Sequence, residues 1–131
     1  MTPLLRKICM GGLLAVGLAA DQSETTVQGV LMDKECSWKA ETRVAPGPRL
    51  EGGMLEAYIH TRQCALMPAC QRSGYGVFTN DTYKFLPFDG AGNQKALALL
   101  KHAQKEEDLR VEVTGTIQGE VMRVARITLL P

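Results

Sequence analysis

Four side chains of this sequence can bind metals or carry thiol chemistry: Cys36, His60, Cys64 and Cys70. Three of them lie within the stretch HTRQCALMPAC, where the spacing is His-x3-Cys-x5-Cys. Thiolate and imidazole are the ligands of tetrahedral Zn²⁺ and of thiophilic Cu⁺. The pattern predicts a transition-metal site with zinc or copper as the ion, although it contains no CxxC pair.

The same residues allow two other interpretations. A disulfide from Cys64 to Cys70, or from Cys36 to either of them, would stabilise the fold by about 2 to 4 kcal/mol and leave one thiol over. A thiol redox protein, with Cys64 as nucleophile and His60 as base, is the minor alternative, because no third residue is identifiable that would orient the histidine. We therefore expect no catalytic residue and no enzyme. Asp33 is a further candidate ligand, but an aspartate that closes a strand is usually a turn residue.

Residues 1–20 have the pattern of a signal peptide. Arg6 and Lys7 precede an apolar run, and Ala19 and Ala20 offer small residues at the cleavage point. The run is too short to span a membrane and no cysteine follows it directly, so we expect a periplasmic or secreted protein without a stable membrane anchor. Cys9 would leave with this segment, and an odd number of three cysteines would remain.

The charge of the chain argues against nucleic acid as a partner. The full sequence has 15 basic and 14 acidic residues, and removing Arg6 and Lys7 changes 15 − 14 = +1 into 13 − 14 = −1. Nucleic-acid binding needs a basic surface that replaces phosphate counterions. The mature chain, residues 21–131, is long enough for one domain, whose partner would be an envelope protein or a small ligand.

Apolar alternation and β-branched residues predict five strands, at 25–32, 75–79, 82–88, 109–117 and 120–130. Gly29 lies inside the first strand, where a glycine marks a bulge or a close backbone approach. Asn80 and Asp81 suit a two-residue hairpin turn. In the last strand the apolar phase changes, which predicts a bulge near Ala125 or Arg126.

Two helices are expected between these strands. Residues 54–66 lack glycine and proline, so a helix there would place His60 and Cys64 on one face, with Pro68 ending it and Cys70 in the exit loop. Residues 37–53 have the composition of a loop. Residues 94–105 predict an amphipathic helix with Asn93 as its N-cap.

This order of elements predicts a mainly β fold. Five strands with a helix between the third and the fourth match an OB-fold-like five-stranded Greek-key barrel, here with a helical Cys/His insertion between strands one and two. An open antiparallel sheet with a packed helix has the same elements, and both architectures stay open at this point.

Several segments of the chain resemble a family of small exported bacterial proteins of the Acidobacteria type. The resemblance covers nearly the whole mature chain, and its most specific part is the HTxxCALMPxC stretch; GVLMDKEC, FLPFD, KALALLK and LRVEVTGTI are similar too. It implies an envelope or secreted location and a single β-rich domain. It implies no role for any of the candidate site residues.

Overall fold

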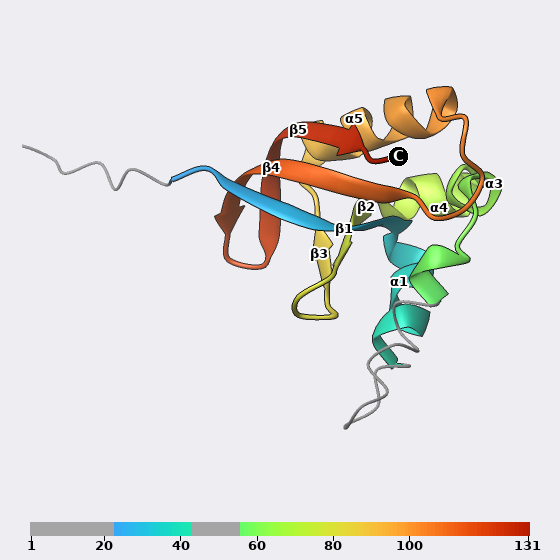
Figure 1. The fold of residues 1–131 in the computed structure, drawn as a ribbon, viewed down its shortest axis with the longest axis horizontal. Helices are drawn as coiled ribbons and strands as arrows, with labels where there is room; N and C mark the ends of the chain where they lie inside the picture. Colours follow the sequence, from blue (N-terminus) through green and yellow to red (C-terminus); the bar gives the residue numbers. More distant parts are fainter. Residues whose placement is uncertain (1–22, 43–55) are drawn as a thin grey trace, which may run out of the picture.

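The computed structural model describes residues 23–42 and 56–131 of the chain. They form a strand-rich mixed fold around one antiparallel five-stranded sheet with the strand order β3-β2-β1-β4-β5 (Figure 1). The strands are β1 (Thr25–Asp33), β2 (Tyr75–Thr79), β3 (Phe85–Pro87), β4 (Arg110–Gln118) and β5 (Val121–Leu129). The helices with stated bounds are α1 (Lys34–Thr42), α3 (Arg62–Ala65), α4 (Pro68–Ser73) and α5 (Gly90–His102).

Strand β1 is the centre of the sheet and pairs with β2 on one side and β4 on the other. Its second half is buried on both faces, including Val30, Leu31 and Met32. At Gly29 a Cβ atom would overlap the backbone of Phe78 on β2, so only glycine fits where the two strands approach each other this closely. The close backbone approach expected at Gly29 is confirmed.

The sheet is open along most of its length. Strands β3 and β5 form its two edges, and within the described residues an isolated parallel bridge between Phe88 and Met122 is the pairing that joins these two sides. The five antiparallel strands agree with the expected β-rich class, whereas the closed OB-like barrel is not confirmed.

Strand β5 contains the expected bulge. Thr114 of β4 pairs with Arg126 and the next residue, Gly115, pairs with Val124, so Ala125 has no partner across the ladder. The phase change in the sequence therefore located the irregularity correctly. The two-residue turn predicted at Asn80 and Asp81 is wrong, because β3 begins only at Phe85 and the connection extends over residues 80–84.

Helix α5 packs against β5 and β2 and buries Ala96 and Leu100 in the core. It starts before the predicted position, since Asp89 is its N-cap and accepts a hydrogen bond from the Gly92 amide at 2.9 Å. Asn93 is not the cap. Its side-chain oxygen instead accepts a hydrogen bond from the backbone N–H of Tyr75 at 2.8 Å.

The insertion between β1 and β2 is helical, as expected, but its elements differ. Helices α1, α3 and α4 gather at the end of the sheet where β1 finishes (Figure 1). The loop expected at residues 37–53 is wrong over 37–42, which belong to α1, and its remainder lies outside the described residues. Among the helices described, none is long and apolar enough to cross a membrane.

The single helix expected at residues 54–66 is wrong. Residues 56–58 are helical, the chain then leaves helical geometry at His60, and α3 starts at Arg62. Proline is tolerated in the first turn of a helix, where its missing N–H has no partner to lose. Pro68 accordingly begins α4 instead of ending a helix, and Cys70 lies within α4 and not in a loop.

Candidate metal centre

Asp33 links the central strand to the first helix of the insertion. It is the last residue of β1, its side chain is fully buried, and its Oδ1 accepts a hydrogen bond from the Cys36 backbone N–H at 2.9 Å. This is the bond that an N-cap side chain makes to the third residue of a helix. The aspartate therefore starts α1 and places Cys36 at the inner end of that helix.

Cys64 is positioned by the start of α3. Thr61 is the N-cap of this helix, and its Oγ1 accepts a hydrogen bond from the Cys64 backbone N–H at 3.0 Å. Glu106, from the segment after α5, accepts a second one from the Gln63 N–H at 2.9 Å. His60 directly precedes the cap, where its own N–H bonds to the Ala57 carbonyl at 3.2 Å.

Cys70 is buried within α4, which is joined to both neighbouring helices. The Ser73 hydroxyl of α4 accepts a hydrogen bond from the Glu35 N–H of α1 at 3.2 Å. The Gln71 side-chain amide of α4 donates a hydrogen bond to the carbonyl of Leu66, the C-cap residue of α3, at 2.6 Å. These contacts hold α1, α3 and α4 together, so that each helix contributes one cysteine to the same place.

The three sulfur atoms of Cys36, Cys64 and Cys70 all lie within 4.8 Å of one another; we call these residues the sulfur triad. The Cys36 and Cys64 Sγ atoms are 3.9 Å apart, and all three cysteines are free. A disulfide bond would be about 2.05 Å long, whereas two thiolates on one tetrahedral zinc ion at about 2.3 Å are about 3.8 Å apart. The observed distance excludes a disulfide bond; it is that of a weak hydrogen bond between two thiols, and it is also compatible with two ligands of one zinc ion.

A second group overlaps the first. The ligand atoms of Asp33, Cys36 and His60, here the mixed triad, also lie within 4.8 Å of one another. His60 thus belongs with Asp33 and Cys36, and within the described residues no grouping of this kind joins it to Cys64 or Cys70. The four predicted ligands therefore lie in one region. The structure divides them between two groups, however, and neither group contains all four.

His60 Nε2 and Asp33 Oδ2 are 2.7 Å apart at the base of the cluster, and both side chains are more than nine-tenths buried. Their approach does not have hydrogen-bond geometry, and neither atom has another hydrogen-bond partner in the described part of the chain. Buried polar atoms in proteins are nearly always hydrogen-bonded or bound to an ion. This pair therefore needs an explanation beyond packing.

The charges in the cluster affect its thiols. Burial raises the pKa of Cys36 to about 12, and the Asp33 carboxylate and Cys64 add to that rise. Burial and then the Asp33 charge raise the pKa of Cys70 to about 11. Burial also opposes the charge on Asp33, but His60 and the Cys36 amide outweigh it, so the pKa of Asp33 lies below its ordinary value. A bound cation would reverse the thiol shifts, since it stabilises thiolates.

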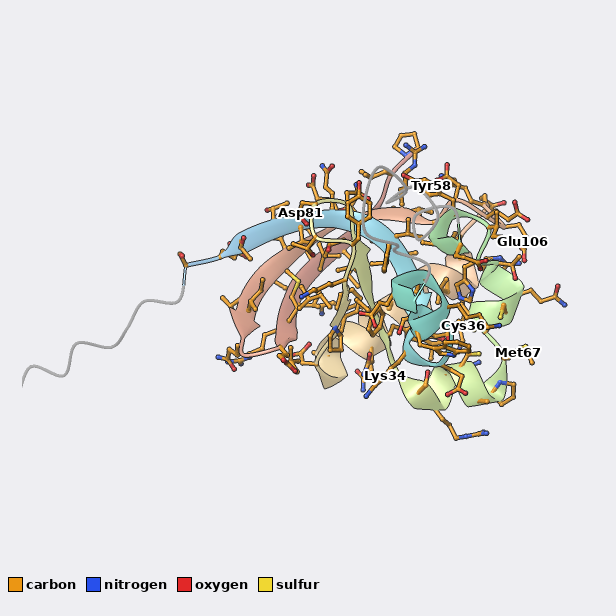
Figure 2. The ribbon with its side chains drawn as sticks, turned by 90° about the horizontal axis from the view of Figure 1, so that it is seen from below. Lys34, Cys36, Tyr58, Met67, Asp81 and Glu106 are labelled. Atoms are coloured by element: carbon orange, nitrogen blue, oxygen red, sulfur yellow. The ribbon has the colours of Figure 1, made fainter. Side chains whose placement is uncertain are left out.

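A pocket of about 240 Å³ opens beside the cluster; Cys36, His60 and Cys64 line it together with Met32 and Ile59, among others. Figure 2 shows Cys36 among the helices at this end of the molecule, well apart from Asp81 over the strands. Met32 is a core residue, 2% exposed, whereas Met67 is 53% exposed.

Comparison of the chain with protein-family models, with curated proteins and with solved structures gives no match. Among the described residues, groups of Cys, His and Asp side chains are arranged so that they can hold a metal ion, and no disulfide forms among them. Asp33 is the residue that sequence reasoning weighted too low. Its signal was the Asp-x-x-Cys spacing at the end of a strand, which is also the spacing of a helix N-cap.

Proposed function

We propose that this protein binds a transition-metal ion through the sulfur triad. The observation that carries the proposal is the convergence of Cys36, Cys64 and Cys70, from three separate helices, to within 4.8 Å without a disulfide. Three thiolates are a ligand set of zinc sites and of soft metal sites generally. The function is binding of the ion, and we propose no catalytic role.

Charge favours zinc over copper in this site. Three thiolates carry three negative charges, and the buried Asp33 carboxylate adds one nearby. Uncompensated charge in a protein interior is costly, and Zn²⁺ removes more of it than Cu⁺ does. Carboxylate and imidazole are also ordinary zinc ligands, whereas Cu⁺ prefers sulfur.

The raised pKa values of Cys36 and Cys70 argue against either of these two thiols as the nucleophile of a thiol enzyme. A nucleophilic cysteine needs a lowered pKa, so that thiolate exists near neutral pH. The pKa values of Cys36 and Cys70 are raised to about 12 and about 11. A metal ion can displace the proton of such a thiol and bind the thiolate, whereas the protonated thiol is a poor nucleophile.

Metal and thiol content together test the proposal. The full chain carrying Cys9→Ser keeps only the three cysteines of the triad; after purification under reducing conditions, elemental analysis should find zinc, and unfolding with a chelator should release three titratable thiols. Cys64→Ser should weaken zinc binding at least about 100-fold, since even an outer residue of a metal site is worth about 10- to 100-fold. His102→Ala, on the exposed end of α5, is the matched control and should change nothing.

The disulfide-stapled module is the competing outcome. Cys36 and Cys64 are close enough that oxidation can join them after small movements. A protein without bound metal and with one titratable thiol, prepared without added reductant, would support the staple and contradict the metal site. If elemental analysis finds copper in place of zinc, the metal site is supported and the assignment of the ion as zinc is contradicted.

The location and the barrel remain part of this proposal. The expected signal peptide, residues 1–20, lies outside the described residues. An exported protein whose N-terminal sequence begins near Asp21 would support a periplasmic or secreted location. The strand order, with a parallel bridge from Phe88 to Met122 joining the two edges, supports an OB-like barrel that is partly open.

A further inference from the structure

The two triads share one ligand. Cys36 belongs to the sulfur triad and to the mixed triad, and its sulfur lies within 4.8 Å of the ligand atoms of the other four residues. A thiolate sulfur has several lone pairs and can bind two metal ions at once. From this arrangement we infer that the protein holds two metal ions, one in each triad, with the Cys36 thiolate as the bridge between them. This inference rests on the proposed metal-binding function.

The first support is the unsatisfied pair at the base of the cluster. Asp33 Oδ2 and His60 Nε2 face each other at 2.7 Å, with side-chain exposures of 0% and 6% and without a hydrogen bond of normal geometry. On one tetrahedral zinc ion a carboxylate oxygen and an imidazole nitrogen are about 3.4 Å apart. The pair has to open by about 0.7 Å to accept an ion, and the ion would satisfy both atoms.

The second support is the net charge of the cluster. Three thiolates and the Asp33 carboxylate give four negative charges, and an imidazole that binds a metal through a ring nitrogen adds none. One Zn²⁺ leaves a net charge of −2 in a largely buried site, whereas two Zn²⁺ ions leave zero. Because an uncompensated charge is costly to bury, the second divalent ion removes a penalty that the first leaves in place.

The third support is the number of ligands, which is sufficient for two ions when Cys36 is shared between them. Each triad provides three protein ligands, and zinc usually takes four, so each ion keeps one position for water or another small ligand. Cys36 and His60 of the mixed triad line the pocket of about 240 Å³, and so does Cys64 of the sulfur triad. The pocket therefore gives solvent access to ligands of both ions.

Counting bound ions per folded chain tests this inference. The full chain with Cys9→Ser, depleted of metal and titrated with Zn²⁺, should show two bound ions by native mass spectrometry. His60→Ala removes a ligand of the mixed triad alone and should leave one ion, and Cys70→Ser removes a ligand of the sulfur triad alone and should also leave one. His102→Ala should keep both ions.

The bridge itself is tested with Co²⁺ in place of zinc. Two Co²⁺ ions that share a thiolate couple magnetically, so the magnetic moment per cobalt should fall when the second equivalent binds, and His60→Ala should abolish that fall. Circular dichroism before and after titration shows that each variant is folded.

The outcomes separate this inference from the function on which it rests. One zinc ion in the parent chain, unchanged by His60→Ala, would overturn the second site and keep the sulfur triad. Two ions without magnetic coupling would overturn the bridge. No bound ion at all would overturn the proposed function itself.

Discussion

Asp33 Oδ2 and His60 Nε2 lie 2.7 Å apart next to Cys36, one of three clustered cysteines that come from three different helices. The aspartate ends the central strand of the sheet, and the histidine immediately precedes the cap of α3. This contact joins the central strand of the sheet to the helical insertion, and it places the Asp33 carboxyl group beside the sulfur triad. Four properties of the protein should follow from this arrangement and from the elements that support it.

Metal uptake should release protons. In the ion-free protein at pH 7 both Cys36 and Cys70 are thiols, because their pKa values are raised to about 12 and about 11, and they bind an ion as thiolates. We expect release of at least two protons per chain and tighter binding as the pH rises. Calorimetry in two buffers with different ionisation enthalpies measures this number, and equal heats in both buffers would contradict it.

The ion-free protein should lose stability in acid through Asp33. Its pKa in the folded state is lowered, so its ionised form contributes stability above the unfolded-state pKa of about 3.9, and this contribution disappears as the pH falls through the folded-state value. Urea unfolding of the parent and of Asp33→Asn should therefore show a larger difference at pH 6 than at pH 3. The asparagine keeps an oxygen that can accept from the Cys36 amide, so the comparison isolates the charge. A difference that does not change with pH would refute this role.

Loss of the α3 cap should weaken both the fold and the site. Thr61→Ala removes the acceptor of the Cys64 amide, and a lost N-cap costs about 1 kcal/mol of unfolding free energy. Zinc affinity should fall as well, since Cys64 is positioned by this bond. Thr61→Ser retains a hydroxyl and is the matched control. Equal stability of all three proteins in urea would count against the cap.

The close approach of β1 and β2 at Gly29 should not tolerate a side chain at that position. A Cβ there overlaps the Phe78 backbone, which cannot move without breaking the pairing of β1 with β2. We expect Gly29→Ala to cost about 1 to 3 kcal/mol, the usual penalty for overpacking a filled interior. Gly90→Ala is the control, because nothing lies within 4 Å of a Cβ at that position. Similar unfolding midpoints for the two variants would contradict the close approach of β1 and β2 at this position.

The strands were predictable because their signals are local. Alternation located β4, the phase change located the unpaired Ala125, and a glycine in mid-strand indicated the close approach at Gly29. Each of these depends on neighbours within a few residues. The open sheet was harder to predict, because closure depends on how far β3 and β5 approach each other and not on any local pattern.

The helical insertion and the site were predicted only in part. Pro68 fits both the end of one helix and the start of another, and the sequence alone does not distinguish these roles. Asn93 looks like a helix cap, but its side chain bonds to Tyr75 of a distant strand instead. The cysteines could be predicted as site residues because thiols are metal ligands. Their grouping with Asp33 and His60 could not be predicted, because it depends on how the whole insertion folds.

The most direct test of the metal site is X-ray absorption at the zinc edge, on the full chain with Cys9→Ser loaded with one equivalent of zinc. We predict sulfur atoms in the first coordination shell at about 2.3 Å, and loss of that shell's sulfur signal in the variant with serine at all three triad positions. A shell of nitrogen and oxygen atoms alone, at about 2.0 to 2.2 Å, would show that the sulfur triad does not hold the ion.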